Sequence, residues 1–196
     1  MRCANVVLLA ADDALTAEYR SVIWEYVSGV THPVVLNSSV ILTDENLTPV
    51  GNADPRWTGC GWLDRLWLFF ENPGKAPGSV IPRKTVIDSC FMNVDPRCLI
   101  EDFPLWLSLS DTAKFRRIRR PIVLYRQHQN SLSKQVQNRD FCWSIGYCIG
   151  FAETVADSLP ERLLSRLGRR RWYQQSAVAM RHHVEDGRRC AAVMLR

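Results

Sequence analysis

Strand-like and helix-like patterns alternate along the first 135 residues of the chain, and this alternation constrains the fold most. Three short segments, Val6–Leu9, Val34–Thr43 and Ser79–Ile81, have the length and composition of strands. Helical patterns lie between them, at Ala17–Val30 and Trp57–Phe70. Alternation of this kind is typical of α/β proteins. We therefore predict an α/β fold in which the three strands share one mixed sheet.

The pattern changes near residue 135. Before that point, two short helices over Pro82–Asp88 and Pro104–Ser110 and two strands over Phe115–Ile118 and Ile122–Tyr125 complete the α/β pattern. After it, only helical periodicity is found, in Asp140–Asp157, Pro160–Leu167, Trp172–Val184 and Arg188–Leu195. We therefore predict two units, an α/β body at residues 1–135 and a basic helical tail at residues 136–196.

Several tryptophans fall in the helical patterns. Trp106 is spaced with Leu105 and Leu109 as one helix face, which predicts a core position. We interpret Trp57, Trp62 and Trp67 in the same way, as packing residues and not as exposed stacking platforms.

The net charge of +5 conceals an asymmetry between the two ends of the chain. Residues 1–113 contain 8 Lys and Arg against 14 Asp and Glu, a net charge of −6, whereas residues 114–196 contain 17 against 6, a net charge of +11. The arginines cluster at 116–120 and 169–171, and this asymmetry indicates an anionic partner. We expect no nucleic acid, because no recognition motif accompanies the charge. An anionic membrane surface is the favoured partner, with Trp172 at the headgroup level.

The cysteines and the hydropathy indicate a cytoplasmic protein. Seven cysteines occur without a CxxC pair and without a secretory signal, so we expect reduced thiols and neither a zinc site nor a disulfide framework. No stretch reaches the roughly 18–20 apolar residues that a membrane span requires. We expect a cytoplasmic chain that is at most peripheral at the inner face of the membrane.

Two pairs of adjacent carboxylates are the candidate site residues. Asp12 and Asp13 follow the first strand, and Glu101 and Asp102 precede the helix that starts at Pro104. Carboxylates with phosphate oxygens are the usual ligands of Mg²⁺ and Mn²⁺, and a carboxylate at a helix N-terminus can act as an oriented base. The alternative for the first pair is a solvated turn. The alternative for Asp102 is simple N-capping of the helix.

A cation and an imidazole complete this set. Tyr125-Arg126-Gln127-His128 follows the last strand of the body. The Arg126 guanidinium suits bidentate contact with phosphate, and neutral His128 is a competent metal ligand. The alternatives are an ion pair of Arg126 with Glu101 or Asp102 and a purely structural His128. Together, these residue types are what is needed to deprotonate a hydroxyl group beside a metal-bound diphosphate.

The order of these motifs resembles about the C-terminal two-thirds of a bacterial family 2 glycosyltransferase of the non-processive, surface-polysaccharide type. The resemblance runs from about Asn5 to Ser133. Its strongest part contains Asn72-Pro73, Glu101-Asp102-Phe103-Pro104-Leu105-Trp106 and Tyr125-Arg126-Gln127-His128. The resemblance implies a GT-A, Rossmann-like domain. It also implies an inverting transfer of sugar from a nucleotide-diphospho-sugar to a saccharide or lipid-linked acceptor.

The resemblance also implies a role for each candidate residue. Asp102 corresponds to the catalytic base, and Asp12 and His128 correspond to ligands of a divalent metal, Mn²⁺ or Mg²⁺. In a substrate-binding role, Glu101 would contact acceptor hydroxyls, and Arg126 and Asp13 would contact the donor.

Two departures from the family pattern lead to a second expectation. The family's first strands, which form much of its nucleotide-base pocket, have no counterpart before Asn5, and Ala10 stands where the family has the first Asp of its Asp-x-Asp motif. The alternative to an active enzyme is therefore a truncated, non-catalytic remnant or interaction module that binds an anionic surface.

Overall fold

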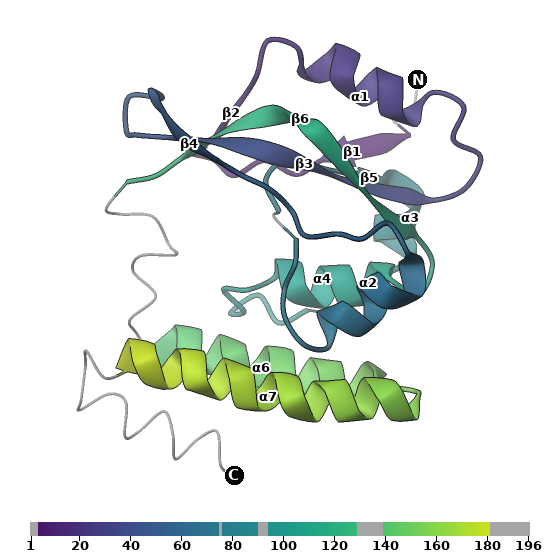
Figure 1. Cartoon of the computed structure of the whole chain (residues 1–196), viewed down its shortest axis with the longest axis vertical. Coiled ribbons are helices and arrows are strands. Elements are labelled where there is room, and N and C mark those ends of the chain that lie inside the picture. Colours follow the sequence, from purple (N-terminus) through teal and green to yellow (C-terminus); the bar gives the residue numbers. More distant parts are fainter. Residues whose placement is uncertain (1–3, 75, 90–93, 129–138, 181–196) are drawn as a thin grey trace.

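The computed structural model describes residues 4–74, 76–89, 94–128 and 139–180. These residues form a mixed α/β fold with one sheet and six helices (Figure 1). The strands are β1 (Asn5–Val7), β2 (Ala14–Leu15), β3 (Val34–Thr43), β4 (Pro49–Ala53), β5 (Ser79–Pro82) and β6 (Lys114–Arg126). The helices are α1 (Tyr19–Val27), α2 (Gly61–Leu68), α3 (Arg83–Asp88), α4 (Asp102–Leu109), α6 (Arg139–Val155) and α7 (Leu159–Met180).

The strands form a single mixed sheet in the order β1-β5-β3-β6-β2, with β4 paired to β3. The β3–β6 pair is parallel and the other pairs are antiparallel. The prediction that the first three expected strands share one mixed sheet is confirmed. The bounds of β3 are those expected, whereas β1 ends at Val7 and β5 extends to Pro82.

Strand β6 joins the two strands expected at Phe115–Ile118 and Ile122–Tyr125. Its pairing with β3 shifts register where Ser38 is opposite Ile118 and Val40 is opposite Val123. The residues between, which include Pro121, form an irregularity, because proline has no backbone N–H to donate to a neighbouring strand. The break expected between Ile118 and Ile122 is therefore a bulge within the single strand β6.

Two strands were not predicted. β2 has only two residues, and β4 contains Gly51 and Asn52, which are poor strand formers. β4 returns from β3 through a turn near Asp44, whose Oδ1 accepts hydrogen bonds from the backbone N–H groups of Asn46 at 2.8 Å and Thr48 at 2.9 Å.

Each face of the sheet has its own hydrophobic core. On one face, α1 packs through Val22 and its neighbours on Leu36, Val40 and Ile118. Helix α1 is shorter than expected and ends before Gly29, which has a positive φ of 78°. On the other face, an aromatic core lies between the sheet and the helices α2 and α4; Figure 1 shows these helices on that side of the sheet.

Trp57, Trp106 and Phe115 are at the centre of the aromatic core. The rings of Trp57 and Phe115 stack with centroids 4.1 Å apart, and Trp106 meets Phe115 edge-on at 6.3 Å. Trp106 is fully buried, so its predicted core position is confirmed. The prediction for Trp62 and Trp67 is wrong, because α2 is covered on one side only and leaves these residues 65 % and 41 % exposed.

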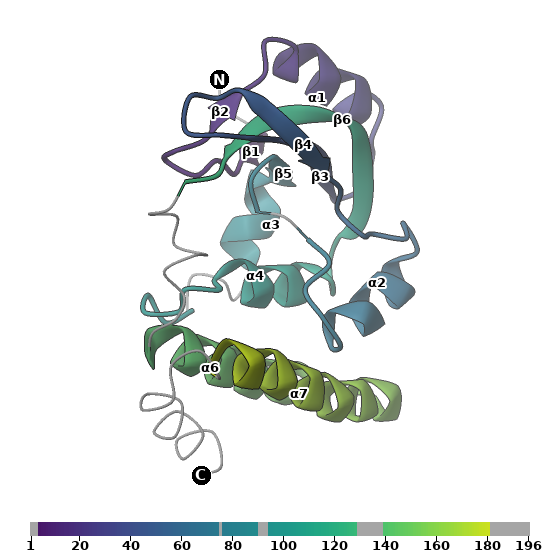
Figure 2. The same cartoon turned by 60° about the vertical axis from the view of Figure 1, so that its left-hand side comes forward.

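Helices α6 and α7 form an outer layer against α4 and α2 (Figure 2). Cys148 and Ala152 of α6 belong to the same core as Phe103 and Trp106. The boundary expected at residues 135 and 136 falls outside the described residues, and the helices beyond it share a core with the body. Trp172, expected at the headgroup level of a membrane, packs edge-on against Phe103 with ring centroids 5.4 Å apart.

Helix α7 is continuous where two helices, Pro160–Leu167 and Trp172–Val184, were expected. Gly168 lies at the junction and lets α7 approach the end of α2, because a Cβ atom there would lie 2.3 Å from the backbone oxygen of Phe69. Because α7 packs closely on α2 and α6, it continues as one helix through Gly168. The helix expected at Arg188–Leu195 lies outside the described residues.

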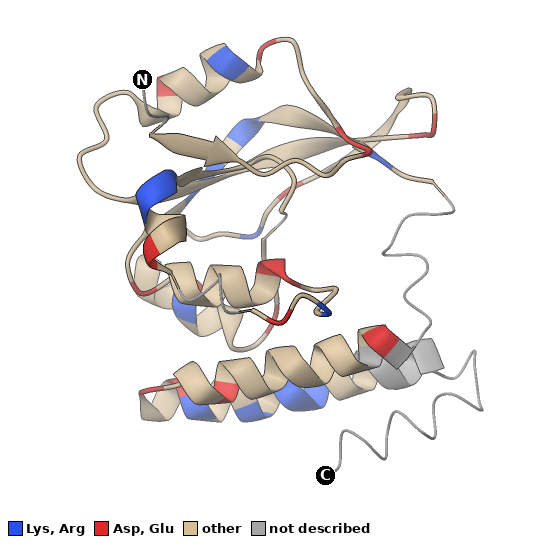
Figure 3. Ribbon diagram, turned by 180° about the vertical axis from the view of Figure 1, so that it is seen from behind, with Lys and Arg blue, Asp and Glu red and all other residues tan. Residues whose placement is uncertain are grey.

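Ion pairs within the molecule partly neutralise the charge asymmetry; Figure 3 shows where the charged residues lie along the ribbon. Arg117 pairs with Asp54 at 2.5 Å, and Arg120 pairs with Glu25. In the helical layer, Arg171 pairs with Glu71 and lies over the ring of Phe70. Several arginines of the basic clusters thus hold the two ends of the chain together and are not free for an anionic partner.

Candidate functional site

The edge of the sheet brings together two predicted motifs that are far apart in the sequence. β2 pairs with the end of β6, with Ala14 opposite Leu124 and Leu15 opposite Val123. This antiparallel register sets the residues just before β2 beside those at the end of β6. Asp12 and Asp13 are consequently positioned by β2, and not directly by β1, which lies at the opposite edge of the sheet.

Asp12 and His128 are in direct contact. The distance between Asp12 Oδ2 and His128 Nε2 is 2.8 Å, and both side chains keep part of their surface in solvent. This hydrogen bond is the main cause that lowers the pKa of Asp12 below its usual value, and the charge of Arg126 also contributes. Asp12 is therefore held as a carboxylate beside an imidazole.

Asp13 lies deeper at the same edge. Its Oδ1 accepts a hydrogen bond from the backbone N–H of Arg126 at 3.0 Å. Its Oδ2 is buried and has no hydrogen-bond partner among the described residues. Burial is the main cause that raises the pKa of Asp13, and the charge of Asp12 raises it further. A ligand that donates a hydrogen bond or carries positive charge would stabilise this carboxyl group.

Arg126 takes part in this group through its backbone and its charge. Its Nε is buried and, within the part of the chain that the structure describes, has no hydrogen-bond partner. An unpaired buried N–H group of a cation is costly, and an anionic ligand would satisfy it. Asp12, Asp13, Arg126 and His128 form what we call the sheet-edge group.

Glu101 and Asp102 form a second group at the start of α4. The helix begins at Asp102, two residues earlier than expected, and Glu101 is its N-cap without a side-chain capping bond. Asp102 Oδ2 instead accepts a hydrogen bond from Asn72 Nδ2 at 3.0 Å. The N-capping interpretation of Asp102 is therefore wrong, because this residue lies in the first turn and its carboxylate turns to the Asn72 loop.

Glu101 differs from Asp102 in its surroundings. The pKa of Glu101 is raised, mainly because the protein around its carboxyl group displaces water, and the adjacent charge of Asp102 adds to this effect. Asn72 belongs to the Asn72-Pro73 pair of the family resemblance, from which no role for its side chain was predicted. The signal that was available is the side-chain amide, which can orient a carboxylate across a loop.

A divalent ion fits the sheet-edge group only in part. A carboxylate and an imidazole are suitable donors for Mn²⁺, and Oδ2 of Asp13, which has no partner in the described part of the chain, is a further oxygen at the same sheet edge. Among the described residues, however, no group of three or more His, Cys, Asp or Glu side chains has the geometry of a complete metal site. An ion at this edge would therefore need oxygens from a bound diphosphate to complete its coordination.

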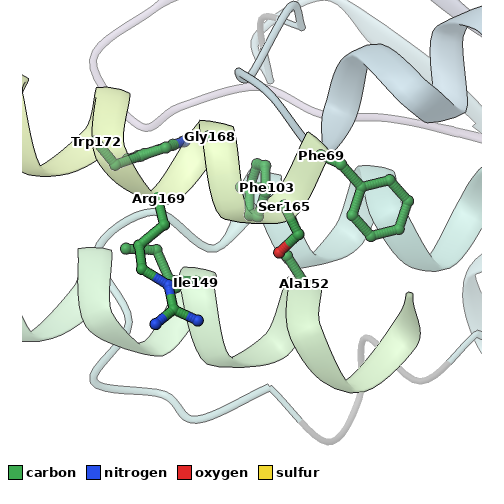
Figure 4. Close-up of a pocket in the computed structure, with 8 residues that line it drawn as sticks. All are labelled: Phe69, Phe103, Ile149, Ala152, Ser165, Gly168, Arg169 and Trp172. Atoms are coloured by element: carbon green, nitrogen blue, oxygen red, sulfur yellow. The ribbon is translucent and has the colours of Figure 1, made fainter. Parts of the chain in front are cut away.

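A small cavity lies elsewhere, between α4, α6 and α7 (Figure 4). Its volume is about 10 Å³, and its lining includes Phe103, Ser165, Arg169 and Trp172. Ser165 Oγ and Arg169 Nε are buried and lack hydrogen-bond partners among the described residues. The cavity is the size of about one water molecule, which these two groups would bind, and it is too small for a substrate.

No protein-family model matches the sequence, and no characterised protein or solved structure matches it significantly. The GT-A fold and the sugar-transfer activity implied by the resemblance therefore remain proposals. In the described part of the chain, no helix is both long enough and apolar enough to cross a membrane.

Proposed function

We propose that the protein is an inverting glycosyltransferase of the GT-A type. It would move a sugar from a nucleotide-diphospho-sugar to a saccharide or lipid-linked acceptor in the synthesis of a cell-surface polysaccharide. The observation that carries the proposal is the 2.8 Å contact between Asp12 and His128, which joins motifs 116 residues apart. A carboxylate and an imidazole held together at one sheet edge are two of the donors that such a metal-dependent donor site needs.

The sheet-edge group would bind the diphosphate of the donor. Asp12 and His128 would hold a Mn²⁺ or Mg²⁺ ion, which would offset the negative charge on the departing diphosphate. Among the described residues, Arg126 has a buried N–H group without a partner, which suits a phosphate oxygen. Asp13 likewise has a carboxylate oxygen without a partner there, which suits a hydroxyl group of the sugar donor. The unsatisfied atoms of this group thus match the chemistry of the donor.

The second group would act on the acceptor. Asp102 would take the proton of the attacking hydroxyl as its oxygen bonds to the anomeric carbon and the bond to the diphosphate oxygen breaks. The side-chain amide of Asn72 donates to Asp102 Oδ2 and orients the carboxylate for this proton transfer. Glu101 would bind other acceptor hydroxyls. The amide orients the base without itself supplying a proton.

Calorimetric titration of the chain with uridine and guanosine diphosphates, with and without Mn²⁺, tests the donor side. We expect binding that requires Mn²⁺ and is weakened at least ~10-fold in His128→Gln, because second-layer changes alone cost that much at metal sites. Lys84→Gln is a matched surface control, since Lys84 is exposed and pairs only with Asp88 among the described residues.

A folded chain that binds neither nucleotide with Mn²⁺ would overturn the proposal. The non-catalytic remnant or interaction module would then be the better interpretation. Binding of a nucleoside diphosphate without Mn²⁺ would support the proposed donor site but contradict the proposed role of the metal ion. Circular dichroism of wild type and variants establishes that each chain is folded.

A further inference from the structure

Exposed leucines form a stripe along α7. Leu159, Leu163 and Leu167 are 70 %, 50 % and 50 % exposed. They are spaced four residues apart, which aligns them along one side of a helix. Large apolar side chains in such a row are unusual on a surface that faces only water.

A parallel stripe of arginines lies beside the leucines. Arg162, Arg166 and Arg170 are also four residues apart and exposed, and each follows a leucine by three residues. None of these three has a carboxylate partner among the described residues. The neighbouring arginines on either side of Arg170 differ, because Arg169 pairs with Glu153 and Arg171 pairs with Glu71. We call the six residues of the two stripes the leucine–arginine face.

The packing of α7 fixes the direction of this face. Ser165, Gly168 and Trp172 are on the opposite side of the helix and meet the rest of the protein. Glu161, the acidic residue of α7, also turns inward and pairs with Arg65 at 2.5 Å. Figures 1 and 2 show α7 in the outermost layer, on the side away from the sheet. The leucine–arginine face therefore points outward without a carboxylate of its own helix.

We propose that the leucine–arginine face docks on the surface of a bilayer that contains anionic phospholipid. A helix with leucines beside cationic side chains is suited to lie in the plane of the interface, where apolar groups enter the acyl boundary and arginines meet headgroup phosphates. A second copy of the chain is a poorer occupant, because the arginines of the two copies would repel each other. Nucleic acid would use the arginines but leave the leucines in water. The proposal does not rest on sugar transfer.

This surface differs from the one that charge clustering alone predicts. Of the arginines at 116–120 and 169–171, several are engaged in ion pairs within the molecule. Only Arg170 of the triplet belongs to the docking surface. The interface is therefore defined by helical spacing, with two of its arginines outside the clusters.

Co-sedimentation with vesicles is the test. We expect the chain to bind vesicles of equal parts phosphatidylglycerol and phosphatidylcholine and not vesicles of phosphatidylcholine alone. Binding should weaken with salt, as the Debye length falls from ~10 Å at 0.1 M to ~3 Å at 1 M. Binding that is equal for both vesicle types, or absent from both, would overturn the proposal.

Matched variants locate the surface. Arg166→Glu should weaken vesicle binding about 10-fold or more. The change removes one arginine, whose attraction to the anionic surface raises the affinity about fivefold, and adds a carboxylate that the surface repels. Arg119→Glu makes the same charge change on β6 and should change binding less than about twofold, because its side chain lies outside the docking surface. Equal losses would show adsorption through net charge alone and would contradict the proposal.

The leucines need their own comparison. Leu163→Ser with Leu167→Ser should weaken binding at least ~10-fold through lost apolar burial, whereas Trp24→Ser, on α1, should have little effect. Light scattering and a duplex DNA titration accompany these measurements. A dimer that is lost in the leucine variant, or DNA binding without vesicle binding, would identify a different occupant and overturn the proposal.

Discussion

The two pairs of adjacent carboxylates look alike in the sequence but have different surroundings in the fold. Asp12 contacts an imidazole at the sheet edge, and Asp102 contacts a side-chain amide at the start of α4. In each pair the pKa of the other member, Asp13 or Glu101, is raised mainly because the protein displaces water from its carboxyl group. The same two-residue feature therefore supplies a carboxylate paired with an imidazole in one place and a carboxylate oriented by an amide in the other.

This difference teaches that the partner, and not the acid itself, sets the chemistry of each pair. An imidazole and a carboxylate can share a cation, whereas a neutral amide can only hold a carboxylate in one direction. The predictions below test this division of roles, first through activity, then through ion binding and last through stability.

The largest effect is expected at the second pair. Asp102→Asn should lower turnover by at least ~10²-fold in a form of the protein that transfers sugar, because the amide cannot accept the proton. Glu101→Gln should act mainly on KM for the acceptor. Steady-state rates with a nucleotide-diphospho-sugar donor measure both. Retained turnover in Asp102→Asn would place the base elsewhere and remove the distinction between the pairs.

A smaller effect is expected at the first pair, where the two carboxylates should separate in ion binding. Asp12→Asn should weaken Mn²⁺ binding in the presence of uridine diphosphate by ~10-fold or more, because a direct ligand is lost. Asp13→Asn should weaken it less, because an amide oxygen can still accept the hydrogen bond of the Arg126 backbone. Electron paramagnetic resonance of free Mn²⁺ measures both affinities. Equal losses of Mn²⁺ affinity in the two variants would mean that Asp12 and Asp13 contribute equally to ion binding.

The smallest effect concerns stability against pH, measured by urea unfolding with a chelator present. The pKa of Asp12 is lowered in the fold, so its stabilisation is present above the unfolded pKa and is lost as pH falls through the folded one. The pKa of Asp13 is raised, so its contribution is present below the unfolded pKa and is lost as pH rises through the folded one. Each effect should be below about 1 kcal/mol, as is usual for partly exposed groups.

Asn variants should reveal these opposite signs. Relative to wild type, Asp12→Asn should lose stability between about pH 3 and about pH 7, whereas Asp13→Asn should gain it over the same interval. Two variants that change in the same direction would show that the hydrogen bond with His128 does not distinguish the two carboxylates.

Much of the fold could be predicted because its signals are local. The ten residues of β3 and the core position of Trp106 follow from runs and spacings that can be read along the chain. The N-cap reading of Asp102 failed because composition cannot tell which residue begins a helix. The exposure of Trp62 and Trp67 was missed because amphipathic spacing does not reveal how much of a helix its neighbours cover.

The sequence by itself determined the α/β class, the adjacency of the carboxylates and the four-residue spacing of leucines and arginines in α7. Only the tertiary structure decided that Asp12 meets His128, that Asp102 turns to Asn72 and that the leucine–arginine face points outward. The physical reason is that periodicity reports the local backbone, whereas these outcomes depend on pairing and packing between distant segments. The decisive strand, β2, has two residues, too few to carry a pattern, and only its hydrogen bonds to β6 define it.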